Sequence, residues 1–325
     1  MKLLSTPNRR TFLASLAGAL SAMIADGNID NARANAQQND EIIAHRRPMF
    51  IKAAGLLVHN LEGMILFYQQ VIGLKIMNRY QGGALLGIGG AGLIELVRTT
   101  RAASSPPTAT AGLYHLAFVM PTRRDLARWI VHAARNHFQV SGLADHRVTE
   151  SVYLNDPEGN GIEVYAERPV DQWHWSGDQV DMGVFDLDVG DLLKLTDREK
   201  DDYSNAPDAM RIGHIHLKVG ELTAAETFYA GLVGLDVTRR APGVVFMSSG
   251  KYHHHVAANV WESQGAGKRD EGELGLAWFE IAVTDPSLLK EQKRRLRTAD
   301  IALKTFSNGL EVADPWGNLV RLIQI

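Results

Sequence analysis

The chain has 325 residues, 45% of them hydrophobic and 22% charged, as is typical of a globular protein, and roughly 100–200 residues per domain suggests two domains. The net charge of −3 and the pI near 6.5 argue against a nucleic-acid-binding protein, which would carry a basic patch. Because cysteine is absent, disulfides, thiolate metal sites and cysteine nucleophiles are excluded, and any metal must be held by His, Asp or Glu.

Residues 1–36 have the features of a signal peptide. The pair Arg9-Arg10 precedes a mildly apolar run over residues 13–24, which is shorter than the roughly 20 residues that span a bilayer. Small residues between Ala32 and Ala36 offer cleavage sites. We therefore predict twin-arginine export to a periplasmic or secreted location, with a mature chain that begins near Gln37 and contains no membrane segment. An ordinary secretory signal or an N-terminal tail is the alternative.

Two motifs recur along the rest of the chain. Leu61, Phe67-Tyr68 and Gly73 have helical spacing with a terminal glycine, and they return 161 residues later as Leu222, Phe228-Tyr229 and Gly234. The turn sequence Asp-Pro-x-Gly-Asn occurs at 156–160 and at 314–318, and each copy precedes an alternating strand. An internal duplication of this kind organises the whole fold.

The duplication indicates four consecutive units, each reading strand, helix and three strands (βαβββ), within an α+β fold. They begin near Phe50, Gly112, Arg211 and Gly275. Units one and two make a first domain over 48–168, and units three and four make a second over 211–325. Residues 169–210 are polar and rich in aspartate, and we interpret them as a linker that folds over a site.

This arrangement resembles the vicinal oxygen chelate superfamily over nearly all of residues 48–325. The sequences around His115, His146, Tyr153 to Glu163, His214 and the run 252–255 are similar to the two-domain catechol 2,3-dioxygenase family of extradiol ring-cleaving enzymes. The resemblance implies two curved-sheet cups, with metal ligands on the first and last strands of the units. Fold alone does not decide the activity, because glyoxalases and antibiotic-binding proteins share this superfamily.

Only some units keep a ligand at those positions. The first strands of units two and three carry His115 and His214, and the last strand of unit two carries Glu163. The corresponding positions of the other units hold Ala53, Trp278 and Arg321. Two histidines and one carboxylate form the facial triad that binds non-haem Fe(II), and Mn(II) fits the same ligands. His216 is a rival ligand, because alternation puts it on the same strand face as His214.

This distribution predicts how the units pair. His115, His214 and Glu163 reach one ion only if unit two pairs with unit three. Units one and four would then pair around an empty, apolar cup.

Three further residues are predicted to act on the substrate. Tyr153 lies on the strand before Glu163 and would hydrogen-bond a substrate oxygen. Within the run His253-His254-His255, the resemblance assigns the acid–base role to His255, whose type of side chain titrates near neutral pH. His146 lies in the loop that enters the Tyr153 strand and is a candidate for the substrate pocket.

Together these features predict an exported extradiol dioxygenase of aromatic catabolism. Its partners would be a small aromatic diol and O2, held at Fe(2+) or, as the alternative, Mn(2+), and assembly into a homo-oligomer is left open. A glyoxalase-like lyase or isomerase is one alternative, which a fourth protein ligand would favour. A non-catalytic small-molecule-binding protein of the same fold is the other.

Overall fold

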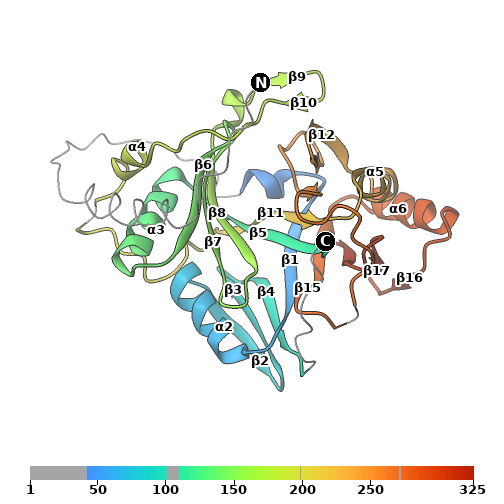
Figure 1. Ribbon diagram of the computed structural model, residues 1–325, viewed down its shortest axis with the longest axis horizontal. Coiled ribbons are helices and arrows are strands. Elements are labelled where there is room, and N and C mark those ends of the chain that lie inside the picture. Colours follow the sequence, from blue (N-terminus) through green and yellow to red (C-terminus); the bar gives the residue numbers. More distant parts are fainter. Residues whose placement is uncertain (1–41, 101–109, 198, 271) are drawn as a thin grey trace.

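Four βαβββ units follow one another along the chain in the computed structural model (Figure 1), as the repeats predict. The structure describes residues 42–100, 110–197, 199–270 and 272–325. The predicted signal peptide at 1–36 therefore lies outside the described residues. Among the described residues, no helix combines the length and the apolar character needed to cross a membrane.

The first two units have closely similar element orders. The elements of unit one are β1 (Met49–Val58), α2 (Leu61–Phe67), β2 (Lys75–Tyr80), β3 (Gly83–Ile88) and β4 (Ala91–Arg98). The elements of unit two are β5 (Gly112–Met120), α3 (Arg123–Arg135), β6 (Val140–Asp145), β7 (Thr149–Asn155) and β8 (Gly161–Glu167). The described part of the linker then contributes a 3-10 turn (Val170–Gln172), two short strands and an α-helix, β9 (Trp175–Ser176), β10 (Gln179–Val180) and α4 (Val189–Leu193).

The last two units repeat the order. The elements of unit three are β11 (Arg211–Lys218), α5 (Leu222–Glu226), β12 (Asp236–Ala241), β13 (Val244–Ser248) and β14 (Val256–Asn259). The elements of unit four are β15 (Gly275–Val283), α6 (Pro286–Thr298), β16 (Leu303–Thr305), β17 (Gly309–Ala313) and β18 (Leu319–Gln324). A π-helical turn extends both α2 and α5.

The units combine into two eight-stranded sheets, and each sheet takes one unit from each half of the chain. One sheet has the order β12-β13-β14-β11-β5-β8-β7-β6, which joins unit three to unit two. The other has the order β16-β17-β18-β15-β1-β4-β3-β2, which joins unit four to unit one. The joints are the antiparallel pairs β11–β5 and β15–β1. The predicted pairing of unit two with unit three is therefore confirmed.

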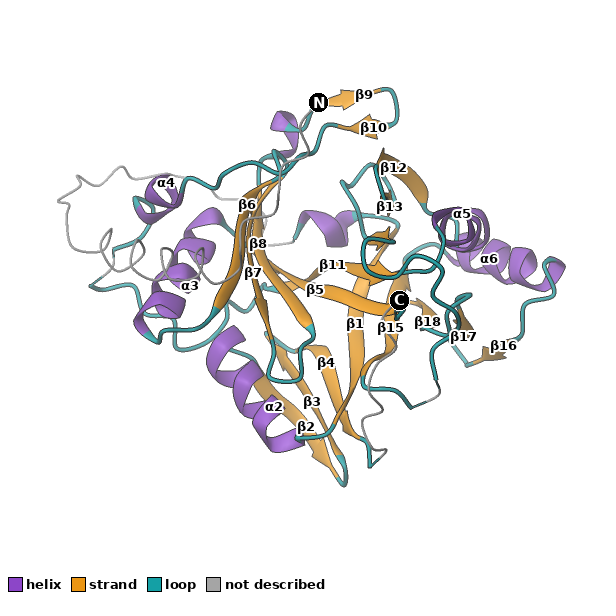
Figure 2. Ribbon diagram, viewed as in Figure 1, coloured by secondary structure: helices purple, strands orange, loops and turns teal. Residues whose placement is uncertain are grey.

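Helices lie outside the curled sheets, with α2 and α3 on one side of the view and α5 and α6 on the other (Figure 2). Their apolar faces and the convex faces of both sheets bury one continuous hydrophobic core. Burial of apolar surface of this kind is the main favourable term in folding.

The two repeated motifs meet inside this core. The tyrosine of each Phe-Tyr pair donates a hydrogen bond to the aspartate of the following unit's turn: Tyr68 Oη to Asp156 Oδ2 at 3.1 Å, and Tyr229 Oη to Asp314 Oδ2 at 2.8 Å. All four side chains are buried. Each of these buried carboxylates also accepts hydrogen bonds from its own turn, which satisfies its polar oxygens. The duplicated sequence thus produces a duplicated contact between successive units.

Candidate metal centre

Three predicted ligands converge at the centre of the sheet made by units two and three. Glu163 Oε2 lies 3.0 Å from His115 Nε2 and 3.1 Å from His214 Nε2, and the two nitrogens are 3.3 Å apart. All three side chains are buried, and among the described residues they form the one group whose ligand atoms could share an ion. We call them the His–His–Glu triad. They lie on three adjacent strands, β5, β8 and β11.

The spacing of these atoms fits a shared metal ion. Donors at about 2.1 Å from a common ion are about 3.0 Å apart on neighbouring octahedral corners, or about 3.4 Å at the tetrahedral angle. The observed separations of 3.0–3.3 Å match such a set of neighbouring corners. Two imidazoles and one carboxylate at this spacing leave the other coordination positions to small ligands. The buried triad therefore suggests a metal site.

Irregularities in strand pairing orient the two ligand histidines toward Glu163. Between β11 and β5 the register shifts at Gly213 and again at Tyr114, so that each ligand histidine directly follows an extra residue. Such bulges kink a strand and redirect the neighbouring side chain. At position 213 only glycine fits, because a Cβ atom would lie 1.8 Å from Tyr165 Oη. The symmetric bulges explain why His115 and His214, which are not paired with each other, both reach Glu163.

Electrostatics favours the protonation states that bind metal. Burial lowers the pKa of His214, against the opposing effect of Glu163, so its imidazole is neutral. Burial by itself raises the pKa of Glu163, but the two histidines outweigh it and hold this pKa well below its usual range. The ring of His214 packs against His254, with the ring centres 4.1 Å apart. Its Nδ1 has no hydrogen-bond partner among the described residues, so packing holds this ring.

Tyr153 and His146 lie beside the triad and contact each other. Tyr153 Oη is 2.7 Å from His146 Nε2, and the Tyr153 ring centre lies 5.6 Å from that of His115. His146 Nδ1 lies 2.6 Å from the Gly183 carbonyl, which can only accept, so Nδ1 carries the proton. Nε2 of a neutral His146 then accepts from Tyr153. Burial raises the pKa of Tyr153 well above its ordinary value, and Glu163 adds to this, so the phenol stays protonated.

The position of His255 corrects its predicted role. Its Nε2 donates to the Ala44 carbonyl at 3.2 Å, and its Nδ1 accepts from the Ser249 amide at 3.3 Å. His255 is buried and does not line the cavity, so it tethers the segment before β1 to unit three. The run His253–His255 lies before β14, which begins only at Val256, so strand alternation does not set the directions of its side chains. His254 is the member of the run that lines the cavity.

A cavity of about 780 Å³ opens over the triad. Both halves of the sheet line it, and so do Met182, Gly183 and Val184, so the linker forms part of the cavity wall. His216 also lines the cavity, but its Nε2 is 3.0 Å from the Asn259 side-chain amide, outside the triad. The rival-ligand hypothesis for His216 therefore finds no support in the geometry.

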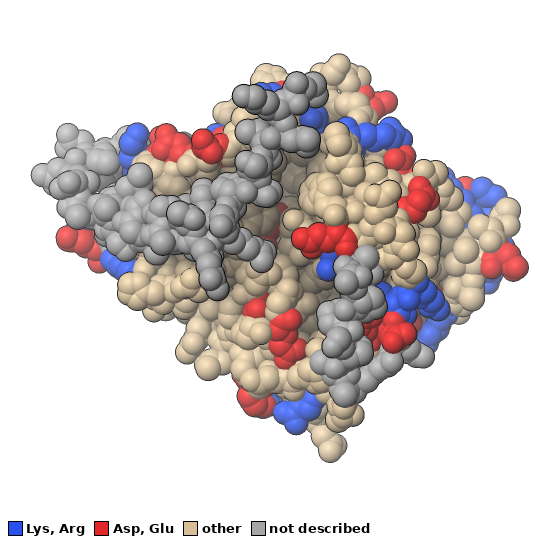
Figure 3. All heavy atoms as spheres, viewed as in Figure 1, with Lys and Arg blue, Asp and Glu red and all other residues tan. Residues whose placement is uncertain are grey.

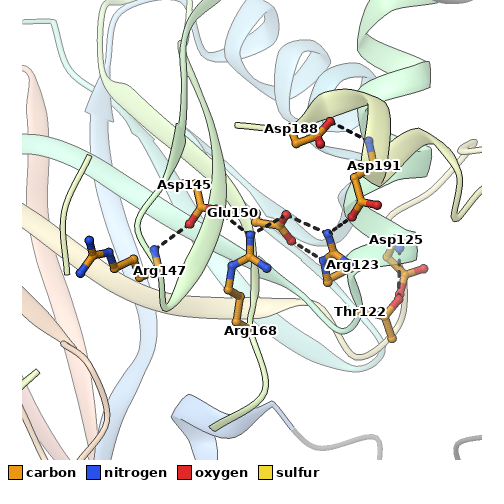
Figure 4. Close-up of polar contacts among 9 residues, drawn as sticks. All are labelled: Thr122, Arg123, Asp125, Asp145, Arg147, Glu150, Arg168, Asp188 and Asp191. Atoms are coloured by element: carbon orange, nitrogen blue, oxygen red, sulfur yellow. Dashed lines mark hydrogen bonds and ion pairs between the residues drawn. The ribbon is translucent and has the colours of Figure 1, made fainter. Parts of the chain in front are cut away.

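A network of ion pairs fixes the linker and the His146 loop to unit two (Figure 4). Glu150, which is buried, pairs with Arg123 and with Arg168. Arg123 also forms an ion pair with Asp191 of α4 at 2.9 Å. Arg168 also forms one, at 2.6 Å, with Asp145, which is next to His146. Because Asp145 also pairs by its backbone with Phe185, the network holds the cavity-lining stretch 182–184 in place. Ion pairs around a buried carboxylate of this kind are costly to break singly.

The second cup differs from the prediction of an empty, apolar space. The Arg321 guanidinium stacks on the Trp278 ring at 4.1 Å and pairs with Glu311 at 2.8 Å. On the unit-one side, Glu95 accepts a hydrogen bond from Tyr80 at 2.7 Å. The positions equivalent to the triad are thus filled by a cation–aromatic contact and an ion pair.

On the molecular face shown in Figure 3, acidic and basic side chains occur singly or in small groups among uncharged residues. No continuous basic patch covers the described part of this face.

Comparisons with known proteins agree with this fold. The family model described as the Glyoxalase/Bleomycin resistance protein/Dioxygenase superfamily matches residues 50–164 and 211–322. Catechol-2,3-dioxygenase of Bacillus subtilis (strain 168) is 32% identical over 267 residues, which cover 81% of this chain and 92% of that relative.

Two solved structures are similar in fold only, because their sequence identities are low. One is a protein of Bacillus subtilis subsp. subtilis str. 168, with a TM-score of 0.58 at 11% identity, and the match covers 86% of each chain. The other is glyoxalase I from Zea mays, with a TM-score of 0.51 at 13% identity, covering 86% of this chain and 94% of that one.

Proposed function

Since the chain belongs to the glyoxalase/bleomycin resistance protein/dioxygenase superfamily, we propose that it is an extradiol dioxygenase that opens the ring of catechol or a substituted catechol with Fe(II) and O2. The identity to a catechol-2,3-dioxygenase supports an oxygenase-type enzyme. The observation that carries the proposal is the buried His–His–Glu triad at the floor of a cavity. Mn(II) is the alternative metal.

The triad would hold the metal through two imidazole nitrogens and one carboxylate oxygen. The chemistry that a ferrous ion supplies when bound is one-electron activation of dioxygen next to a chelated diol. The protein's own contribution is to bury the three ligands, keep the His214 imidazole neutral and enclose the reactants under the linker. Enclosure limits competing reactions with water.

Tyr153 and His146 would orient the diol. While His146 is neutral, the Tyr153 hydroxyl donates to Nε2, and its oxygen is left to accept a hydrogen bond from a substrate hydroxyl. A proton that reaches His146 reverses this direction, because Nε2 then donates to Tyr153, and the phenol can donate to the substrate. The Tyr153–His146 pair can therefore accept a hydrogen bond from the diol before it loses a proton and donate a hydrogen bond to it afterwards.

His254 is the residue we propose as the base. Burial lowers its pKa well below the ordinary value, so the ring is neutral and keeps one acceptor nitrogen, although the same shift makes it a weaker base than an exposed histidine. Its Nδ1 lies 2.8 Å from Nδ1 of His253, and for Nε2 to act as the acceptor, His254 must donate in this hydrogen bond. His253 thereby positions the ring, while His254 lines the cavity.

The direct test uses protein purified without oxygen and loaded with iron. We expect about one ferrous ion per chain and, on adding catechol and air, a yellow ring-opened semialdehyde. Glu163→Gln should bind little iron and form no product. Glu95→Gln changes a carboxylate in the second cup and should match the unaltered protein, which makes it the control. A protein that binds iron but opens no catechol would refute the proposal, and turnover of a hemithioacetal instead would favour the glyoxalase-like alternative.

We also propose export by the twin-arginine route to a periplasmic or secreted location, on the basis of Arg9-Arg10 and the apolar run that follows. Replacing both arginines with lysine should leave the precursor in the cytoplasm. Unchanged export of this variant would mean that the signal is of the ordinary secretory type.

A further inference from the structure

A row of directly paired residues leads from the triad to the edge of the sheet. His115 pairs with His216, His216 with Ala257, Ala257 with Phe246, and Phe246 with Arg239 of the edge strand β12. Directly paired residues point to the same face of a sheet. At about 4.8 Å per strand, the backbone of Arg239 lies about 14 Å along the curved sheet from that of His216. All members of the row except the small Ala257 line the cavity.

The cavity floor between the two ends of this row is aromatic. The ring of Phe246 lies 6.2 Å from that of His216 and 5.0 Å from that of His254. Trp261 stands edge-on to His216 at 5.7 Å and is 51% exposed at the mouth of the cavity. Such a surface favours a flat or apolar group placed beyond the reacting ring. The cavity volume is also in the range that holds drug-sized ligands, and so exceeds the needs of a single catechol ring.

The guanidinium of Arg239 forms no ion pair with the described residues. It is half-buried, and its one hydrogen bond to them runs from Nη1 to the Val180 carbonyl at 3.1 Å. The next residue, Arg240, behaves differently, because it pairs with Glu226 at 2.6 Å. Arginine carries five N–H donors in a planar fork that matches a carboxylate. A half-buried cation of this kind in a cavity wall is suited to an anionic ligand.

Besides Arg239 and the ligand Glu163, two further Lys, Arg, Asp or Glu side chains line the cavity, Lys218 and Glu262. Neither forms an ion pair within the described part of the chain. Glu262 is exposed and carries the opposite charge, so it repels an anion at the mouth. Lys218 is a second cation, but it lies outside the row that joins the triad to Arg239 and lacks the planar fork. These differences favour Arg239 as the anchor and make Lys218 a matched control.

We infer that the substrate is a catechol whose ring carries a substituent ending in a carboxylate, and that Arg239 binds this carboxylate while the diol lies at the triad. This inference rests on the proposed ring-cleaving function and specifies its substrate class. The substituent would lie across the aromatic floor formed by His216 and Phe246. Arg239 is therefore a specificity-determining residue, at the opposite end of the substrate from the bonds that change.

The test compares dihydroxyphenylpropanoates, with the diol at the 2,3- or the 3,4-positions, with their primary amides, which have the same diol and no charge. Dissociation constants are measured by calorimetry without oxygen, and kcat/KM is measured in air, on iron-loaded protein. We expect at least one acid to be preferred over its amide by about 10- to 100-fold, the scale of a charge-assisted hydrogen bond. Arg239→Gln should reduce this preference to about twofold or less, whereas Lys218→Gln should retain it.

The outcomes separate this inference from the proposed function. Ring opening with no preference for either acid, or a preference that survives Arg239→Gln, overturns the inference and leaves the function intact. A preference that Lys218→Gln abolishes and Arg239→Gln does not would also overturn it. If no catechol is opened but the acids bind more tightly than the amides through Arg239, the proposed reaction fails and the anionic-ligand site stands.

Discussion

The hydrogen bond between Tyr153 and His146 offers a sharp test of the proposed chemistry. Tyr153→Phe removes the hydroxyl that lies 2.7 Å from His146 Nε2 and keeps the ring that packs near His115. His146→Gln removes the other partner. A positioned acid–base group contributes about 10²–10⁴-fold to the rate, which corresponds to about 2.7–5.4 kcal/mol of transition-state stabilisation. We expect each variant to lose turnover within this range and to keep its metal.

The double variant decides whether the two groups act as one unit. If they work through the shared hydrogen bond, it should be no slower than the worse single variant, because residues that act together give non-additive losses. Independent groups would multiply their losses to about 10⁴–10⁸-fold. The assay is kcat/KM for all four proteins, with bound iron per chain as the control. Multiplied losses, full activity of Tyr153→Phe, or loss of its metal would each refute the reasoning.

The remaining predictions concern the ligands, the histidine run and pH. Alanine at any one member of the triad should empty the site, which metal analysis of purified protein will show, and full iron in any of the three would contradict the site. His254→Gln should lower turnover by about 10²-fold or more, whereas His255→Gln should mainly lower the melting temperature. The reverse pattern would return the acid–base role to His255. Burial raises the pKa of Glu167 from 4.5 to about 7, so its contribution to stability is complete below pH 4.5 and is lost as the pH rises through about 7. The free energy of unfolding, measured with urea, should fall by about 3 kcal/mol over this pH range. A pH dependence of stability that is unchanged in Glu167→Gln would contradict this assignment.

Local patterns account for what the sequence could predict. The four units were expected near Phe50, Gly112, Arg211 and Gly275, and β1, β5, β11 and β15 begin at or next to those residues. Turn glycines and strand alternation act over a few residues, so they can be read directly from the chain. The positions of the ligands within their strands then predicted which units pair, since only one pairing joins His115, His214 and Glu163.

Contacts between distant segments account for what could not be predicted. Whether His254 or His255 faces the cavity depends on where β14 begins and on the Ala44 carbonyl, more than 200 residues away. The filling of the second cup depends on Trp278, Arg321 and Glu311 meeting across a sheet. A glycine within a strand, here Gly213, is a weak indication of the bulge before His214. Strand periodicity alone does not reveal the extra residue before either ligand histidine.

The exchange of units between the sheets makes each half of the chain dependent on the other. A chain that stopped in the linker would leave β1 and β5 as open edges, although most of their residues are buried in the complete protein. Long apolar edges of this kind are templates for aggregation. Each half of the chain therefore resembles one subunit of an obligate heterodimer, and the linker joins the two halves into one polypeptide. Produced separately, they should be insoluble alone and recover solubility and metal binding only when they fold together.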